Sequence, residues 1–404
     1  MKSTNGKDNL SPNPAANKRK TRTLLYMSIF IFLISVGEGM TAPAIPLYGD
    51  GLGASYWQLG FLMTGYSITY TIFTLGAGRL SDKIGRKSLL LFSIVLTLIA
   101  STGYYFSVGP ITLLIFRTTE GMSRGILWPV AEAIIADNTE YEDRGSAMGR
   151  FTAAYGAGAT LGNLAGGFFM EYINLTAVFP VYPVLALIVF ITILKGVEEA
   201  EETSHSDPDI SLESFNLVEE YLKIWPICFM GFAYAGFLYS VQGLLSQVAN
   251  IFEVSFLGIG IIYALFWGMR TGAFTSSGIM ATIFGRKRGI LLGVFLSLLS
   301  TGTLILGEGF WPLIFAAAIG GLGTGIMFPL CLTLIADYTT SETHGFGMGA
   351  LEFTMGIGMI SQTAISGVLG EVGGVNFTYL FTFVVMLIGL FVTFKYIREP
   401  SQVH

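Results

Sequence analysis

Long apolar runs separated by short polar segments make up most of the chain. About twelve of these runs have roughly 20 to 26 residues, the length that an α-helix needs to cross a hydrocarbon core about 30 Å thick. Membrane β-strands are excluded, because they need only about 10 alternating residues. The pattern predicts an all-α membrane protein whose twelve transmembrane helices cover residues 24–48, 56–79, 88–107, 110–136, 146–170, 174–196, 222–248, 256–279, 289–307, 310–336, 346–370 and 374–396.

The polar segments between these runs predict the domain organisation. The N-terminal segment is basic and leads into an apolar run that is too long for a signal-peptide core, so we expect a tail there. A longer polar segment separates two sets of helices. The predicted parts are a cytoplasmic N-terminal tail (1–23), an N-terminal six-helix bundle (24–196), an acidic cytoplasmic linker (197–221), a C-terminal six-helix bundle (222–396) and a cytoplasmic C-terminal tail (397–404).

The positions of the cations predict the orientation. Loops on the cytoplasmic side of a membrane carry an excess of Lys and Arg. With the N-terminus inside, the six outer loops hold no Lys or Arg, and we expect a multi-pass protein of the cell membrane with both termini in the cytoplasm. The cations in or beside cytoplasmic segments are then Lys83, Arg86, Lys87, Arg144, Arg150, Lys195, Lys223, Arg286, Lys287, Arg288, Lys395 and Arg398.

Composition narrows the functional classes further. Hydrophobic residues make up 52% of the chain and charged residues 12%, whereas about a quarter of a soluble protein is charged. Cys228 and Cys331 lie in apolar runs, and His205, His344 and His404 lie in polar segments or at the C-terminus. This distribution excludes a disulfide framework and a buried His or Cys metal site, so we expect no metal and no cofactor.

The net negative charge of the chain is concentrated in the predicted linker. Residues 197–221 hold nine of the 27 acidic residues and no Lys or Arg, so they account for the net charge of −5. Such a composition is typical of a solvated hinge between two halves. A regulatory docking segment is the alternative.

An internal repeat decides the architecture. Shifted by 200 residues, Gly78–Lys87 (GRLSDKIGRK) aligns with Gly278–Lys287 (GIMATIFGRK), and Ile135-Ala136-Asp137 aligns with Ile335-Ala336-Asp337. A six-helix unit is therefore present twice in the same orientation, since an even number of helices returns the chain to its starting side. Two parallel halves of this kind place a substrate site near the middle of the membrane and expose it to either side by rocking.

Several motifs resemble the major facilitator superfamily. Gly78–Lys87 is similar to its signature loop between helices 2 and 3, and Arg117–Gly121 (RTTEG) resembles its fourth-helix motif Arg-x-x-Gln-Gly, with Glu120 in place of Gln. Gly39–Tyr48 resembles a first-helix sequence of the drug:proton antiporter branch. The resemblance covers about residues 24–396 and implies two pseudo-symmetric six-helix bundles that work by alternating access.

One departure from the antiporter pattern bears on mechanism. Gly158–Gly167 resembles the antiporter motif Gly-x-x-x-Gly-Pro-x-x-Gly-Gly, but Asn163 occupies the proline position. Proline kinks a helix and asparagine does not, so the role of Asn163 stays open. The glycines alone are also explained by close helix packing in lipid.

The signature loop is interpreted through the family as a conformational latch that holds the outward-open state. Gly85 gives the short turn its backbone freedom, and Gly78 permits close packing. Asp82 is expected beside the start of a helix in the other half, and Arg86 is expected to reach an acid at the end of the fourth helix. If the cations serve only to fix topology, no latch is needed. The predicted latch residues are Gly78, Asp82, Gly85, Arg86, Lys87 and Asp137.

Five ionisable residues lie well inside predicted spans: Glu38, Arg117, Glu120, Arg124 and Arg270. Because an Arg at mid-helix costs about 2.5 to 3.5 kcal/mol on insertion scales, these groups are expected to be paired or to line water. A carboxyl group can switch its protonation where burial and a nearby cation act in opposite directions, whereas Arg stays protonated. We assign proton coupling to Glu38, Arg117 and Glu120. A fixed Arg117–Glu120 pair that only orients helices is the alternative.

Two helical faces are candidates for substrate contact. Arg117, Glu120, Arg124 and Trp128 share an arc of about 80°, which we expect to face a central cavity. Opposite them, Tyr263, Trp267, Arg270 and Phe274 recur at helical spacing, while Glu132, Asp137 and Glu352 near the inner surface are candidate gate or cap residues. Helix packing is the alternative for the aromatic residues. The predicted substrate-binding residues are Tyr66, Arg124, Tyr239, Trp267 and Arg270.

The sequence therefore predicts a secondary active transporter for a small organic solute, with proton-coupled efflux favoured. Proton-coupled uptake of a sugar or organic anion is the alternative, which three intramembrane arginines against two glutamates would suit. A receptor that has lost transport is another alternative.

Other classes of protein are disfavoured. An enzyme is disfavoured because no buried His, nucleophile with base or HExxH pair occurs, and a channel because no filter loop appears. Without a GxxxxGK[ST] loop, nucleotide drive is excluded. The expected partners are the solute, protons and the bilayer, with no nucleic acid, and we expect a monomer.

Overall fold

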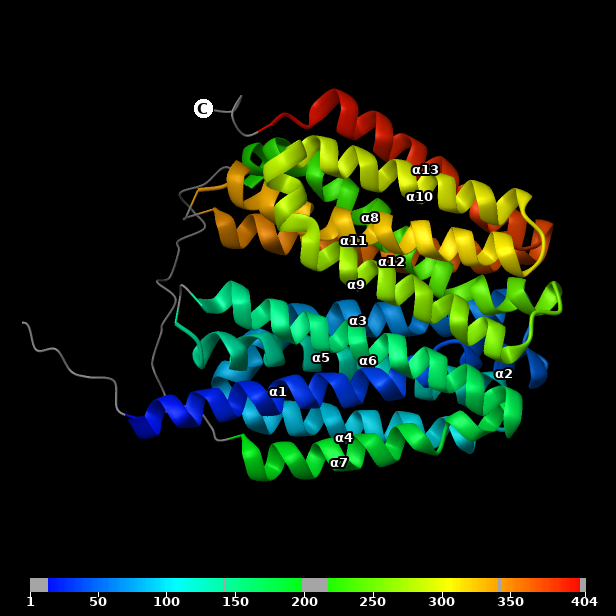
Figure 1. The fold of residues 1–404 in the computed structure, drawn as a ribbon, viewed down its shortest axis with the longest axis horizontal. Coiled ribbons are helices and arrows are strands. Elements are labelled where there is room, and N and C mark those ends of the chain that lie inside the picture. Colours follow the sequence, from blue (N-terminus) through cyan, green and yellow to red (C-terminus); the bar gives the residue numbers. More distant parts are fainter. Residues whose placement is uncertain (1–13, 141–142, 198–216, 341–342, 400–404) are drawn as a thin grey trace, which may run out of the picture.

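The computed structural model describes residues 14–140, 143–197, 217–340 and 343–399, and within these ranges the regular structure is helical. Figure 1 shows the helices running roughly along one common direction. They are α1 (Pro14–Thr41), α2 (Ala44–Gly51), α3 (Tyr56–Ile84), α4 (Arg86–Tyr105), α5 (Pro110–Asp137), α6 (Arg144–Tyr172), the short 3₁₀ helix η2 (Leu175–Val178), α7 (Val181–Gly196), α8 (Leu217–Ile251), α9 (Phe256–Phe284), α10 (Arg286–Leu306), α11 (Phe310–Tyr338), α12 (His344–Gly373) and α13 (Val375–Tyr396).

The helix bounds differ from the predicted spans in several places. The span predicted over 24–48 is divided into α1 and α2, because Pro43 has no N–H to continue the helical hydrogen bonds. α1 begins at Pro14, inside the predicted tail, and α8 begins at Leu217, inside the predicted linker. Most of that linker and residues 1–13 lie outside the described residues, so the predicted domain boundaries stay predictions.

Nine stretches of the described residues are long and apolar enough to cross a membrane. The remaining long helices, α3, α5 and α6, have sufficient length but are more polar. α5, for example, carries Arg117, Glu120 and Arg124 within eight residues. Composition alone therefore identifies fewer spans than the twelve predicted, since three helices of the N-terminal half hold polar side chains in the interior.

The helices form two bundles, each with its own apolar core. Figure 1 shows α1 to α7 together in one bundle and α8 to α13 in the other. Buried residues of the first bundle form two clusters, around Ile94 and around Leu113, and those of the second form one large cluster around Phe266. We call the bundles the N-terminal half and the C-terminal half. The halves meet along α3 with α12 and along α6 with α9.

Residues 200 positions apart make equivalent contacts in the two halves. The Lys87 ammonium donates to the carbonyl of Leu194 at 2.9 Å, and the Lys287 ammonium donates to the carbonyl of Phe394 at 2.8 Å. The repeat seen in the sequence is therefore also present in the packing.

The halves hold each other at one end of the bundle through two reciprocal contacts. The backbone N–H of Trp57, at the start of α3, donates to Glu371 of α12, and that of Leu257, at the start of α9, donates to Glu171 of α6, each at 3.4 Å. A carboxylate at a helix N-terminus is stabilised by the helix dipole. We call this end the glutamate end and the opposite one, where α1 begins and α13 ends, the termini end.

The halves are tightly packed at the glutamate end and diverge towards the termini end. A methyl group on Gly60 would lie 2.5 Å from the Cα of Gly367, and one on Gly167 would lie 2.8 Å from the Cα of Gly260. Nearer the termini end, side chains at these glycines would meet no atom within 4 Å: Gly78, Gly149, Gly278 and Gly349. The structure therefore shows a conformation that is closed at the glutamate end.

Candidate functional site

An ion pair between two helices lies deep in the N-terminal half. Nη2 of Arg124, on α5, lies 2.6 Å from Oε2 of Glu38, on α1, and donates a second hydrogen bond to the Tyr182 hydroxyl of α7 at 3.0 Å. The Tyr182 ring packs against Gly37, where only glycine leaves room for it. The Arg124 side chain is 5% exposed but that of Glu38 is 24% exposed. Glu38 is thus the residue of this pair that solvent can reach.

A second ion pair is fully enclosed. Glu120 accepts from Arg117 one turn earlier on α5 and from the Tyr104 hydroxyl of α4, and Glu120 and Tyr104 are both 0% exposed. The guanidinium of Arg117 also lies over the Tyr66 ring, 4.4 Å from its centroid, and contacts Met63. The expectation that Glu120 faces a central cavity is wrong for this conformation. Its offset of about 60° from Arg117 around the helix turns it towards α4.

Aromatic contacts join the two halves in the middle of the bundle. The ring centroids of Tyr66 (α3) and Tyr239 (α8) are 6.3 Å apart, and those of Tyr155 (α6) and Trp267 (α9) are 5.4 Å apart. Both distances lie within the range in which aromatic rings attract each other. Three of the predicted substrate-binding residues are thus brought to the interface between the halves.

Arg270 lies beside this aromatic interface. Its Nη2 donates to the Tyr234 hydroxyl at 2.6 Å, its guanidinium carbon lies 4.9 Å from the Trp267 ring centroid, and its buried Nε has no hydrogen-bond partner. The predicted mixed cationic and aromatic face therefore exists around Trp267 and Arg270. Tyr263 does not belong to it, since its hydroxyl donates to the Gln242 carbonyl within the C-terminal half.

The predicted latch loop contains the expected ion pair within one half. Arg86 lies between Asp137 at 2.8 Å and Asp82 at 3.3 Å, and Gly85, with φ 94°, adopts a backbone conformation that favours glycine. The Asp82 side chain is 61% exposed, so it is not packed against the other half here. Gly78 has no close neighbour either, so the expected close packing is absent in this conformation. The latch stays a prediction for a state closed at the termini end.

Asn163 leaves α6 unbroken. Its side-chain amide donates to the Ala159 carbonyl at 2.7 Å, while its Oδ1 has no partner. The preceding and following glycines, Gly158, Gly162 and Gly166, leave no room for side chains because they face backbone atoms of α1. Close packing thus accounts for this glycine pattern.

Sequence reasoning missed three tyrosines of the site. Tyr155 could have been found, because it is the one aromatic residue within the small-residue run from Ala153 to Gly158. Tyr104 and Tyr182 carried no such signal, since both lie in apolar runs and gain their roles only from helices distant in sequence. The described residues include no cluster of three or more His, Cys, Asp or Glu that could hold a metal ion.

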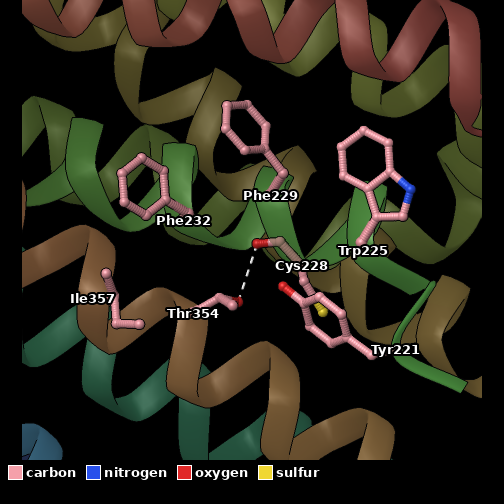
Figure 2. Close-up of a pocket in the computed structure, with 7 residues that line it drawn as sticks. All are labelled: Tyr221, Trp225, Cys228, Phe229, Phe232, Thr354 and Ile357. Carbon is pink, nitrogen blue, oxygen red and sulfur yellow. Dashed lines mark hydrogen bonds between the residues drawn. The ribbon is translucent and has the colours of Figure 1, made fainter. Parts of the chain in front are cut away.

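A hollow of about 230 Å³ lies elsewhere, between α8 and α12 (Figure 2). Within it, the Thr354 hydroxyl donates to the Cys228 carbonyl at 3.1 Å. None of the predicted substrate-binding residues lines this hollow, so it is separate from the ion pairs and the aromatic interface. Its lining residues are Tyr221, Trp225, Cys228, Phe229, Phe232, Thr354 and Ile357.

Comparison with known proteins places these features in context. The family model described as "Major Facilitator Superfamily" matches residues 27–277 and 227–404. Multidrug resistance protein 2 of Bacillus subtilis is 25% identical over 413 aligned residues, covering 96% of this chain and 98% of that protein. Quinolone resistance protein NorA of Staphylococcus aureus is 31% identical over 152 residues, 37% of this chain and 38% of NorA.

Solved structures share the fold at low sequence identity. The nucleoside transporter NupG superposes with a TM-score of 0.77 at 12% identity, covering 93% of this chain and all of that one. A bacterial homologue of the human lysosomal transporter Spinster, in an inward-facing and occupied conformation, gives 0.74 at 14% identity and covers 95% of this chain and 97% of that one.

Proposed function

The chain belongs to the Major Facilitator Superfamily and is therefore a multi-pass transporter of small molecules and not an enzyme; from this premise we propose that it exports small organic molecules in exchange for protons. The observation that carries the proposal is the Glu38–Arg124 pair, a carboxylate partly open to solvent and held by an enclosed cation on another helix. Relatives named for multidrug and quinolone resistance support export and indicate the kind of cargo.

Protonation of Glu38 is the proposed coupling step. The ionised carboxylate binds Arg124 and so joins α1 to α5. A proton on Glu38 removes its charge and most of its attraction for Arg124, which keeps its hydrogen bond to Tyr182. Arg124 then carries a positive charge without a counter-ion, and this cost favours another arrangement of the helices. Glu120 is a second proton carrier in this scheme, reached only when its contacts with Arg117 and Tyr104 open.

The orientation follows from the positive-inside rule. The Lys and Arg residues at the termini end are proposed to face the cytoplasm of the cell membrane. The conformation closed at the glutamate end is then the inward-facing one, ready to take up cargo from the cytoplasm. The monomer is proposed as the functional unit, since one chain supplies both halves and the contacts between them, along α3 with α12 and along α6 with α9.

A transport assay in proteoliposomes tests this function. Norfloxacin, a quinolone, serves as the probe because of the relative named for quinolone resistance. An exchanger accumulates it in vesicles with an acidic interior, whereas a symporter accumulates it when the exterior is acidic.

The second candidate function is proton-coupled uptake of an organic anion. Arg270 favours it, because no carboxylate among the described residues forms an ion pair with this arginine.

The Glu38→Gln variant identifies the proton site. We expect it to lose accumulation driven by an acidic interior and to keep exchange of norfloxacin across vesicles without a pH gradient. Glu308→Gln is the matched control, because Glu308 is exposed in a loop at the glutamate end. Full gradient-driven accumulation by Glu38→Gln would remove Glu38 from the mechanism.

A further inference from the structure

The buried cations of the two halves are compensated differently. In the N-terminal half, Arg124 is paired with Glu38 and Arg117 with Glu120. In the described part of the C-terminal half, no carboxylate lies within ion-pair distance of Arg270. The region between the halves therefore holds one positive charge that the protein's own pairs do not neutralise.

Among the described residues, one acceptor is hydrogen-bonded to Arg270. A guanidinium carries five N–H donors. The structure gives Arg270 the Tyr234 hydroxyl at 2.6 Å, and its Nε is buried without a partner. Its electrostatic neighbours are the hydroxyl groups of Tyr234, Tyr155 and Tyr239. Arg270 thus has donors left for an external acceptor.

Two carboxylates that are present between the halves do not serve this purpose. Glu132 of α5 and Glu352 of α12 interact electrostatically with each other and with Tyr70. Among the described residues, neither forms an ion pair or a hydrogen bond with Arg270. They belong to a separate part of the interface.

The repeat shows that the fold does not need a cation at this position. The residue equivalent to Arg270 in the N-terminal half is Tyr70, whose ring stacks on Tyr66 with 6.1 Å between centroids. An uncharged ring therefore satisfies the same helical position. An Arg inside a membrane span costs about 2.5 to 3.5 kcal/mol on insertion scales, so its presence in only one half indicates a ligand.

The geometry points to a binding site for an organic anion: we propose that the cargo carries a carboxylate on an aromatic ring system, with the carboxylate at Arg270 and the ring against Trp267 and Tyr155. Arg270 and Tyr155 are only partly buried, unlike the Arg117–Glu120 pair. A planar guanidinium matches a carboxylate through two parallel hydrogen bonds. Because Tyr155 belongs to the N-terminal half, a bound ligand would touch both halves.

This site assignment rests on the proposed transport function, but its test needs neither a gradient nor a direction. Calorimetric titration of the purified protein in detergent compares 1-naphthoate, 2-naphthoate and 4-biphenylcarboxylate with the corresponding neutral amides. We expect the carboxylates to bind more tightly than their amides. Arg270→Gln should weaken carboxylate binding by about tenfold or more, the usual worth of a hydrogen bond to a charged group, and leave amide binding unchanged.

Arg270→Lys and Arg288→Gln are the matched variants. The Lys variant keeps the charge but cannot form the two parallel hydrogen bonds, so it should retain part of the preference for carboxylates. Arg288→Gln removes an exposed cation of the same half and should change nothing. Equal binding of each acid and its amide by the natural protein, or equal loss of both in Arg270→Gln, would overturn the proposal. If the natural protein shows no gradient-driven accumulation of norfloxacin while these titrations succeed, the exchange mechanism fails and the anion site stands. If Glu38→Gln keeps gradient-driven transport, only the assignment of the proton site to Glu38 fails.

Discussion

The two halves share their packing but not their buried charges. Arg86 pairs with Asp137 and Arg286 pairs with Asp337, so the ion pair beside the short loop is present in both halves. The buried charged positions of the N-terminal half are neutral in the repeat. The residues 200 positions after Glu38, Arg117, Glu120 and Arg124 are Leu238, Ala317, Gly320 and Thr324.

This difference separates what the fold requires from what transport requires. Contacts found twice support the bundle itself, as with the lysine bonds to the ends of α7 and α13. Buried charges that occur in one half only cost free energy, and the other half folds without them. The N-terminal half is thus the proposed proton-handling half, and the C-terminal half contributes Arg270, a cation inside the bundle for which the described residues supply no carboxylate.

The largest effect is expected for Arg124→Gln. Removing one partner of a buried ion pair typically costs about 3 to 5 kcal/mol of stability, and the coupling step is lost with it. Thermal unfolding in detergent and gradient-driven transport would both fall. Arg124→Lys is the matched control, because it keeps a cation beside Glu38 and should lose less stability and transport than Arg124→Gln.

The double variant Glu38→Gln with Arg124→Gln sharpens this result. It removes both charges, so its stability should recover towards that of the natural protein while transport stays absent. Stability losses that simply add would show that the two side chains are not coupled.

Asp82→Asn should abolish transport with little loss of stability. Its side chain is exposed in this conformation, so we expect a change below about 0.5 kcal/mol in the free energy of unfolding. The expected defect lies in the conformation closed at the termini end. Thr282→Asn, the equivalent change in the C-terminal half, should transport normally. Full transport by Asp82→Asn would remove the latch from the mechanism.

Glu171→Gln and Glu371→Gln should each favour opening of the glutamate end. A carboxylate at a helix N-terminus is worth about 0.3 to 1 kcal/mol, so each change should increase the open population by a few-fold. Spin labels at the exposed positions Val108 and Leu306, one in each half, report the separation of that end. An unchanged distance distribution in both variants would contradict a gating role for these contacts.

The smallest effect is expected for Lys87→Met and Lys287→Met. Each removes the exposed hydrogen bond that a lysine ammonium donates to a carbonyl at a helix end, and an exposed charged contact of this kind is worth about 0.5 kcal/mol or less. The two melting temperatures should fall by the same amount. Unequal shifts would indicate that the repeat is less symmetric in energy than in geometry.

Much of the fold can be predicted from the sequence, because the length of an apolar run and the spacing of a repeat can be measured along the chain itself. The helical spans followed from apolar runs, the two halves from a constant shift of 200 residues, and the Arg86–Asp137 contact from a motif. The break at Pro43 is also visible in the sequence. Proline cannot continue the hydrogen-bonding pattern of a helix, so the run over 24–48 contained its own division.

The partners inside the bundle could not be predicted to the same degree. The cost of burial showed that Glu38 needed a cation, but not that the cation was Arg124, because the distance between α1 and α5 is set by packing. A helical wheel placed Glu120 on the same arc as Arg117 and could not show that α4 covers it. The proton-coupling and substrate-binding assignments themselves stay predictions until the variants above are measured.

The reciprocal glutamates have one more consequence. Each half supplies the acid that stabilises the first turn of a helix in its partner, at Trp57 and at Leu257. When the halves separate at this end as rigid bodies, both contacts break in the same movement. The barrier to opening this end therefore contains one contribution from each half.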